Sequence, residues 1–256
     1  SDMARLAIAC SDKSDLLSLL SLDRAKIQIY GRNRREVELE NTYLSAIKAK
    51  LSSIGAYAMG GQGGSLDHGG NNKFRTQITF ADICGKATAL CLMGQGSTSF
   101  ENIYSTCKDL ASCMQNVYEG SEPVITSNMN EFVSSGGGYA AFEIPKSGSL
   151  YVNQVSTDDI LSRFPSVFSG ITSMLRPCSV VKLMTALVAL DFIVDKSSFL
   201  ELSYNEVSIG GSGSQYYSSD RINVMDALRA MLVESSNVLA TAIGRYTGQI
   251  ILTGRP

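Results

Sequence analysis

The stretch Pro177–Leu187 reads PCSVVKLMTAL, and the expected fold depends on it more than on any other segment. It places Ser179 and Lys182 at the start of a strongly apolar predicted helix, Ser179–Ile193. Residues three apart share one helix face, so the lysine amine can approach the serine hydroxyl. A lysine among apolar neighbours can lose its proton near neutral pH and then accept the serine proton. A serine at this position is also typical of a simple helix N-cap.

A second pattern follows further along the chain. The predicted helix Val224–Val233 leads into Ser235-Ser236-Asn237, a Ser-x-Asn pattern at the start of another predicted helix, Asn237–Tyr246. Ser-x-x-Lys alone is a weak signal, because both residue types are common. The two patterns in this order favour a catalytic site over an isolated helix cap.

In these two stretches the chain resembles the serine D-alanyl-D-alanine carboxypeptidases and the wider penicillin-binding protein and serine β-lactamase superfamily. Pro177–Leu190 is similar to the family's P-A-S-x-x-K-L-M-T-A-L stretch, and Leu232–Asn237 to its Ser-x-Asn motif. The resemblance implies an α/β (α+β) fold of the β-lactamase/DD-peptidase type, in which an antiparallel sheet is flanked by helices. It also implies a location outside the cytoplasm, in the cell envelope.

The resemblance also implies roles for individual residues. Ser179 would be the acyl-accepting nucleophile and Lys182 its general base. Ser235 would pass a proton, and Asn237 would contact the substrate amide. The acyl-transfer reaction would need no cofactor and no metal.

The family's third motif, Lys-Thr-Gly or a variant, normally lies on a strand well after Ser-x-Asn. Leu252–Gly254 is too close to Asn237 to be that motif, and we discount it. The resemblance instead places it before the first two motifs, so the order looks circularly permuted. The substrate-binding residues would then be Gln62, Gly63, Gly64 and Ser65, with the Ser65 and Ser179 amides forming the oxyanion hole.

One position departs from the family pattern. Gln62 stands where the family has Lys, Arg or His, so the cation that would bind a substrate carboxylate is missing there. Lys73 or Arg75 could supply the charge from nearby. The glycines around Gln62 are also typical of a phosphate-binding loop, but no Gly-Lys-Ser/Thr follows, which excludes that interpretation.

The permuted order predicts a single catalytic domain over residues 1–256. Residues 1–120 would correspond to the family's C-terminal half, residues 121–138 to a linker, and residues 139–256 to its N-terminal half. A mostly helical lobe from Ser179 to Tyr246 would pack against the sheet, with the site in the cleft between them. The sequence is compatible with a natural permutation and with an engineered join of two pieces.

Hydrophobic periodicity predicts the remaining elements. Helix is expected to about Leu22 with a break near Ser11–Ser14. Residues 41–51 are expected to be helical or irregular, and residues 101–118 helical. Four segments are expected to pair as two hairpins, 27–30 with 36–39 and 139–144 with 149–152, and two further strands are expected at 74–80 and 87–93, the second of them central.

Composition excludes several other classes of protein. The 256 residues include 22 Lys and Arg against 24 Asp and Glu, a formal net charge of −2, which argues against nucleic-acid binding. The longest apolar run, Leu183–Leu190, is far shorter than the roughly 20 residues of a membrane span. We therefore expect no nucleic-acid partner and no membrane-spanning segment.

Histidine and cysteine usage points away from metal chemistry. The single histidine, His68, cannot form a site with several His ligands, and its surroundings, Gly63–Gly70, are typical of a flexible loop. The six cysteines show neither a C-x-x-C pair nor a metal-ligand spacing. We expect them to be buried or semi-buried thiols.

The sequence as a whole predicts a carboxypeptidase-like serine hydrolase. Its partners would be a D-Ala-D-Ala peptidoglycan stem peptide and, as a trapping analogue, a β-lactam. Two alternatives stay open at this point. One is a β-lactamase-like hydrolase or esterase with an altered substrate, which Gln62 favours; the other is a catalytically inactive protein that binds ligands in the same fold.

Overall fold

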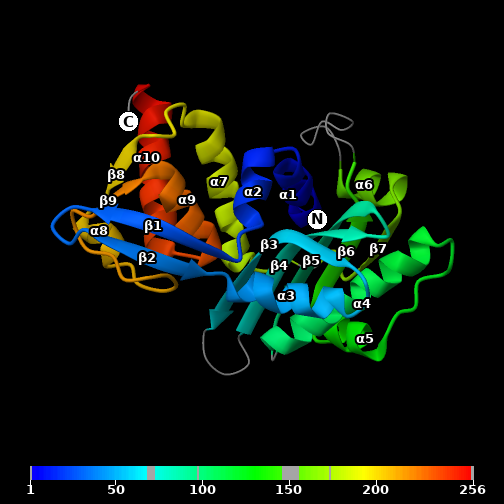
Figure 1. Ribbon diagram of the computed structural model, residues 1–256. Coiled ribbons are helices and arrows are strands. Elements are labelled where there is room, and N and C mark those ends of the chain that lie inside the picture. Colours follow the sequence, from blue (N-terminus) through cyan, green and yellow to red (C-terminus); the bar gives the residue numbers. More distant parts are fainter. Residues whose placement is uncertain (1, 68–72, 97, 146–155, 173, 255–256) are drawn as a thin grey trace. The chain divides into compact units, whose positions relative to one another are not determined.

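A computed structural model describes residues 2–67, 73–96, 98–145, 156–172 and 174–254 (Figure 1). His68 and the expected strand 149–152 lie outside the described residues. The chain divides into two compact units. The first comprises Ser1–Leu17 and Tyr43–Val180, and the second comprises Ser18–Thr42 and Val181–Pro256.

The first unit is built on an antiparallel five-stranded sheet with the order β3-β4-β5-β6-β7. Its strands are β3 (Tyr57–Asp67), β4 (Lys73–Ile83), β5 (Lys86–Gly94), β6 (Gly138–Glu143) and β7 (Ser166–Ser169). The two strands expected at 74–80 and 87–93 are confirmed, and β5 holds the central position. Its run of apolar residues is buried because helices cover both faces of the sheet.

Helices cover the two faces of this sheet unequally (Figure 1). On one face lie α3 (Thr42–Ser52), α4 (Phe100–Tyr118) and α5 (Ser127–Ser134), whose apolar side chains share a core with β4, β5 and β6. On the other face α1 (Asp2–Ser11) packs against β5 and against α6 (Thr157–Arg163). The predicted break is confirmed, since α2 (Ser14–Leu20) begins after α1 ends.

The predicted linker at 121–138 contains a helix that the sequence analysis missed. Within it, Thr126 caps α5 by accepting from the Met129 N–H, and its own hydroxyl donates to Asp109 at 2.8 Å. Met129 and Phe132 are buried in the core. The expectation of a plain connection is therefore wrong for residues 127–134. Strand β6 also pairs with β5 and β7, neither of which was its expected hairpin partner.

The expected loop from Gly63 is wrong as far as Asp67. Every residue from Gly60 to Asp67 is paired with β4, with Gly60 opposite Phe80 and Asp67 opposite Lys73. The glycines therefore belong to a strand at the edge of the sheet. Glycine has a low intrinsic strand preference, so only the neighbouring strand reveals this structure.

The second unit combines a helical bundle with a smaller antiparallel sheet. The sheet order is β2-β1-β9-β8. Its elements are β1 (Arg24–Tyr30), β2 (Arg35–Glu40), α7 (Val181–Phe192), β8 (Phe199–Glu201), α8 (Tyr204–Val207), β9 (Arg221–Asn223), α9 (Val224–Val233) and α10 (Asn237–Thr253). The predicted 27–39 hairpin and the helices α9 and α10 are confirmed. The helix predicted from Ser179 is confirmed only from Val181, since Cys178–Val180 forms a separate 3₁₀ helix. The predicted helical lobe was incomplete because this sheet belongs to it.

In the second unit α10 packs against both α7 and α9 (Figure 1). It runs past the predicted end at Tyr246 to Thr253, and Gly254 caps it in the left-handed conformation at φ 67°. Leu252–Gly254 is thus a helix end, which agrees with discounting it as a third motif. No helix in the described parts of the chain is long and apolar enough to cross a membrane.

Candidate functional site

Lys182 lies in the first turn of α7 and is buried, with 3% of its surface exposed. Its Nζ donates to the Ser235 carbonyl at 2.8 Å, to Ser235 Oγ at 3.1 Å and to Asn237 Oδ1 at 2.7 Å. Burial lowers the pKa of Lys182 to about 8. A large fraction of the amine is therefore neutral at mildly alkaline pH, as a general base requires.

The turn between α9 and α10 presents these acceptors. Ser236 caps α10, since its side chain accepts from the Leu239 N–H at 3.3 Å. Ser235 precedes the cap in the left-handed region, at φ 60°. A non-glycine residue held there costs roughly 1–3 kcal/mol and persists only where its surroundings determine it. The turn thus aims both the carbonyl and the hydroxyl of Ser235 at Lys182.

Lys182 and the Ser-x-Asn residues were predicted from separate motifs, and the structure brings them together within the second unit. Ser235 Oγ lies within hydrogen-bonding distance of the amine, so it can exchange a proton with it. Asn237 keeps its carbonyl oxygen on the lysine, which leaves its amide nitrogen for another acceptor. This cluster can move protons without histidine or metal.

In the first unit, Ser179 lies in the short 3₁₀ helix η2 (Cys178–Val180). A Cβ added to Gly64 would lie 2.5 Å from the Ser179 nitrogen, so the backbone of β3 runs directly against this residue. Thr76 Oγ1 donates to the Pro177 carbonyl at 2.8 Å and fixes the approach to η2. Cys178 is held at φ 49°. The Ser179 amide is therefore placed beside β3.

The other face of β3 is equally close to its neighbour. A Cβ on Gly63 would lie 2.6 Å from a ring carbon of Tyr43, and one on Gly61 would lie 2.6 Å from the Ile78 carbonyl oxygen. Tyr43 is held in place by a 2.6 Å hydrogen bond between its hydroxyl and Thr79 Oγ1. The strand thus has glycine on both faces because side chains would not fit.

Gln62 carries the one long side chain among these glycines. It is 3% exposed, and its Nε2 donates to the Gly63 carbonyl at 2.9 Å. Its Oε1 is buried without a hydrogen-bond partner among the described residues. Ser65, the last of the predicted residues on β3, is exposed. This part of β3 therefore carries an uncharged amide side chain.

Arg75, one of the two alternative cations, is already paired with a carboxylate. Arg75 donates to Asp67 at 2.8 Å, and its guanidinium lies 4.6 Å from the centre of the Phe100 ring. The hydrogen bond from Arg75 lowers the pKa of Asp67, so the two charges neutralise each other at neutral pH. Lys73 is exposed at the start of β4.

The predicted residues thus form two groups. Ser179 and Gln62–Ser65 belong to the first unit, whereas Lys182, Ser235 and Asn237 belong to the second. The sequence analysis did not identify Tyr43 or Glu234, although Glu234 directly precedes Ser235. Tyr216 is buried, and its hydroxyl donates to Glu234 at 2.6 Å.

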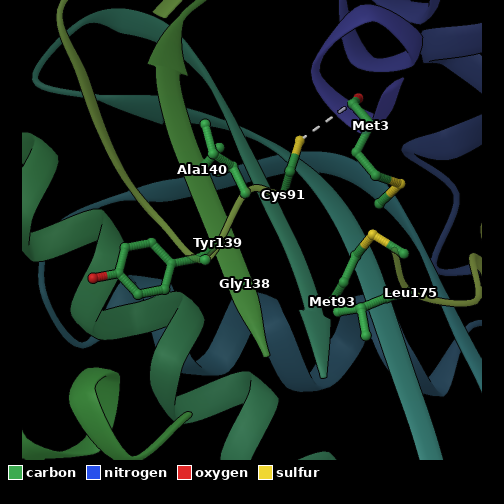
Figure 2. A pocket seen from close by; sticks show the side chains of 9 residues that line it. Met3, Cys91, Met93, Gly138, Tyr139, Ala140 and Leu175 are labelled. Carbon is green, nitrogen blue, oxygen red and sulfur yellow. Dashed lines mark hydrogen bonds between the residues drawn. The ribbon is translucent and has the colours of Figure 1, made fainter. Parts of the chain in front are cut away.

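A separate apolar pocket lies on the α1 face of the first unit (Figure 2). Met3, Met93 and Leu175 gather there, and Cys91 Sγ donates to the Met3 carbonyl at 3.9 Å. The Tyr139 ring points away from this group. The pocket is lined by none of the predicted site residues. Across the described residues, no group of three or more His, Cys, Asp or Glu is arranged to hold a metal ion.

Comparisons with family models, with curated proteins and with solved structures give no match for this chain.

Proposed function

We propose that the protein is a serine acyl-transferring hydrolase of the D-alanyl-D-alanine carboxypeptidase type, with a circularly permuted β-lactamase/DD-peptidase-like fold. The observation that carries the proposal is the contact of the buried Lys182 amine with Ser235 and Asn237. Two motifs far apart in the sequence supply the three residues. A structural lysine needs only an acceptor, but this one has a serine hydroxyl beside it and a lowered pKa.

In the proposed reaction, the neutral amine of Lys182 takes the proton of Ser179 Oγ as that oxygen attacks the substrate carbonyl. The Ser179 and Ser65 amides stabilise the oxyanion. Ser235 Oγ passes the proton from Lys182 to the leaving amine, and the C–N bond breaks. Water then attacks the acyl-enzyme carbonyl, Lys182 takes the water proton and returns it to Ser179 Oγ, and the acyl C–Oγ bond breaks to release the carboxylic acid. The i, i+3 spacing of Ser179 and Lys182 supports their joint action.

The architecture supports the permuted order in its coarse features. The first unit has an antiparallel sheet with a glycine-rich edge strand, β3, whose backbone passes beside Ser179. In the proposed fold, the third motif would lie on a strand beside the nucleophile, as β3 lies beside Ser179. The substrates would be a D-Ala-D-Ala stem peptide or a β-lactam, and the resemblance places the protein in the cell envelope.

The proposal is tested by incubating the intact protein with benzylpenicillin and measuring its mass. We expect an adduct of the drug's full mass at one residue, since ring opening expels no leaving group. The Ser179→Ala variant should form none. An adduct that persists in this variant, or no adduct and no drug turnover in the native protein, would contradict the proposal.

A second candidate is an esterase-like hydrolase whose substrate lacks a free carboxylate. The environment of Gln62 favours it, because the amide there is neutral and Arg75 is paired with Asp67. The two candidates differ in a competition between a thioester with a free carboxylate and its methyl ester. Faster hydrolysis of the free carboxylate supports the carboxypeptidase, and faster hydrolysis of the methyl ester supports the esterase.

A further inference from the structure

The loop between α8 and β9 packs onto the Ser-x-Asn turn. A Cβ on Gly211 would lie 2.2 Å from Asn237 Nδ2, and one on Gly213 would lie 2.7 Å from the Ser236 Cβ. The Asn237 N–H donates to the Ser212 carbonyl at 3.0 Å. The loop therefore touches the turn with its backbone, and the glycines leave room for the Asn237 side chain.

Glu234 fastens the far end of this loop. Its carboxylate accepts from the Tyr216 hydroxyl at 2.6 Å and from the Ser214 hydroxyl. Both are charge-assisted hydrogen bonds, which are stronger than those between neutral groups. Glu234 also ends α9, where its N–H donates to the Ala230 carbonyl. The Glu234 side chain thus binds the loop at the chain position directly before Ser235.

The surroundings of Tyr216 keep its hydroxyl a hydrogen-bond donor at alkaline pH. Burial and the neighbouring Glu234 carboxylate raise the pKa of Tyr216, so its hydroxyl stays protonated and continues to donate. Arg35 acts on the same phenol in the opposite direction, but its guanidinium is paired with Asp220 at 2.8 Å. The phenol and the carboxylate therefore act as a fixed pair.

We propose that Glu234 and Tyr216 are positioning residues that hold the left-handed Ser235 turn, so that Ser235 and Asn237 converge on the Lys182 amine. Glu234 is adjacent to Ser235 in the chain. The backbone of Gly211 packs against Asn237, and that of Gly213 packs against Ser236. Without the pair, the turn can relax and admit water to the amine. That this pair matters for catalysis rests on the proposed function. That it holds the groups around Lys182 in place does not.

The test uses the full chain and measures the Lys182 titration by NMR of ¹³C-labelled lysine, assigned with Lys182→Arg. We expect Glu234→Ala to raise the titration midpoint of Lys182 by at least about one pH unit, because water then stabilises the charged amine. Glu234→Gln, which can still accept from Tyr216, should restore part of the shift. Tyr217→Phe is the matched control, since Tyr217 is an exposed neighbour, and should leave the midpoint unchanged.

The same variants are assayed for the pH profile of acylation by benzylpenicillin. Glu234→Ala should slow acylation about tenfold to a hundredfold at pH 8 and move its rise to higher pH. A midpoint of Lys182 that stays constant or falls in Glu234→Ala overturns the inference, because loss of the carboxylate charge alone can only lower it. Tyr216→Phe conserves the buried ring, so it provides the same test if Glu234→Ala does not fold. If the midpoint rises but the native protein forms no adduct, the inference holds and the proposed function fails.

Discussion

The two groups of site residues are held in place by different means. Around Lys182 the second unit supplies side chains, namely the Ser235 hydroxyl and the Asn237 amide. Around Ser179 the first unit supplies backbone, because β3 passes between η2 and Tyr43 with glycine at each contact. A contact made by a side chain is removed by replacing that side chain. A contact made by the backbone is removed only when a substitution displaces the chain.

The difference also concerns charge. Burial lowers the pKa of the Lys182 amine to about 8, and its acceptors on Ser235 and Asn237 are uncharged. The stretch of β3 beside Ser179 carries the uncharged Gln62, and Arg75 on the neighbouring strand is paired with Asp67. Under the proposed function, the residues that would activate the nucleophile have polar partners, whereas Gln62 brings no charge to the residues that would bind a carboxylate.

The largest expected effect comes from removing the amine. Lys182→Met keeps the length of the side chain but cannot accept the Ser179 proton, so acylation by benzylpenicillin should slow about 10³-fold. Stopped-flow or quenched mass spectrometry measures the rate. Lys196→Met, an exposed lysine of the same unit, is the control. Acylation by Lys182→Met within a factor of three of the native rate would remove Lys182 from the mechanism.

The next effect tests the backbone group. In Gly64→Ala the new methyl would meet the Ser179 nitrogen at 2.5 Å, so β3 and η2 must separate. Displacing an oxyanion donor should lower the acylation rate about 10²–10³-fold. Gly244→Ala is the matched control, because nothing lies within 4 Å of its Cβ on α10. That change should leave the rate unaltered and stabilise the fold by about 1 kcal/mol.

If Gly64→Ala acylates normally, the Ser179 amide does not belong to the oxyanion hole. If Gly244→Ala is as damaging as Gly64→Ala, the loss reflects general destabilisation, which thermal unfolding of both variants will reveal.

Much of this site could be predicted from the sequence where the signal is local. The Ser-x-x-Lys spacing and the Ser-x-Asn pattern each lie within a few residues, and the helices that carry them stand out in the sequence as apolar segments. The contact of Lys182 with Ser235 follows from neither motif alone. The resemblance assigns both motifs to one site, but it did not predict this contact.

Features that depend on distant partners were missed. Gly63–Asp67 forms a strand only because β4 lies beside it. The helix α5 has only eight residues in a largely polar stretch, and the helical spacing of its two buried side chains, Met129 and Phe132, is too short a pattern to predict a helix by itself. The hydrogen bond from Tyr216 to Glu234 joins residues that no local motif connects. In each case the deciding energy comes from tertiary contacts.

A further prediction uses the pH dependence of stability. The pKa of Lys182 is about 8 in the folded state and its ordinary value, 10.5, when unfolded. Between these values the unfolded state binds more protons, so this residue's contribution to the free energy of unfolding rises with pH. From pH 7 to 9.5 the rise is about 2 kcal/mol, at 1.36 kcal/mol for each pH unit above 8.

Urea unfolding of the native protein and of Lys182→Met at both pH values measures that rise. The other titrating groups cancel in the difference between the two proteins. We expect the native protein to gain about 2 kcal/mol relative to Lys182→Met on going from pH 7 to 9.5. A difference that stays constant with pH would mean that the lysine keeps its ordinary pKa in the fold.

The smallest expected effect concerns Gln62, at the position where the proposed function would favour a cation. Gln62→Lys adds a charge to β3, and a hydrogen bond to a charged group contributes about 1.5–3 kcal/mol, roughly tenfold or more in rate. It should therefore raise hydrolysis of a thioester with a free carboxylate about tenfold relative to its methyl ester. Gln62→Met, of similar length without charge, controls for packing and should leave the ratio unchanged. An equal rise in both variants would attribute the preference to shape. A rise in Gln62→Lys alone would mean that one residue of β3 separates a carboxylate-recognising site from a neutral one, while the Lys182 group stays the same.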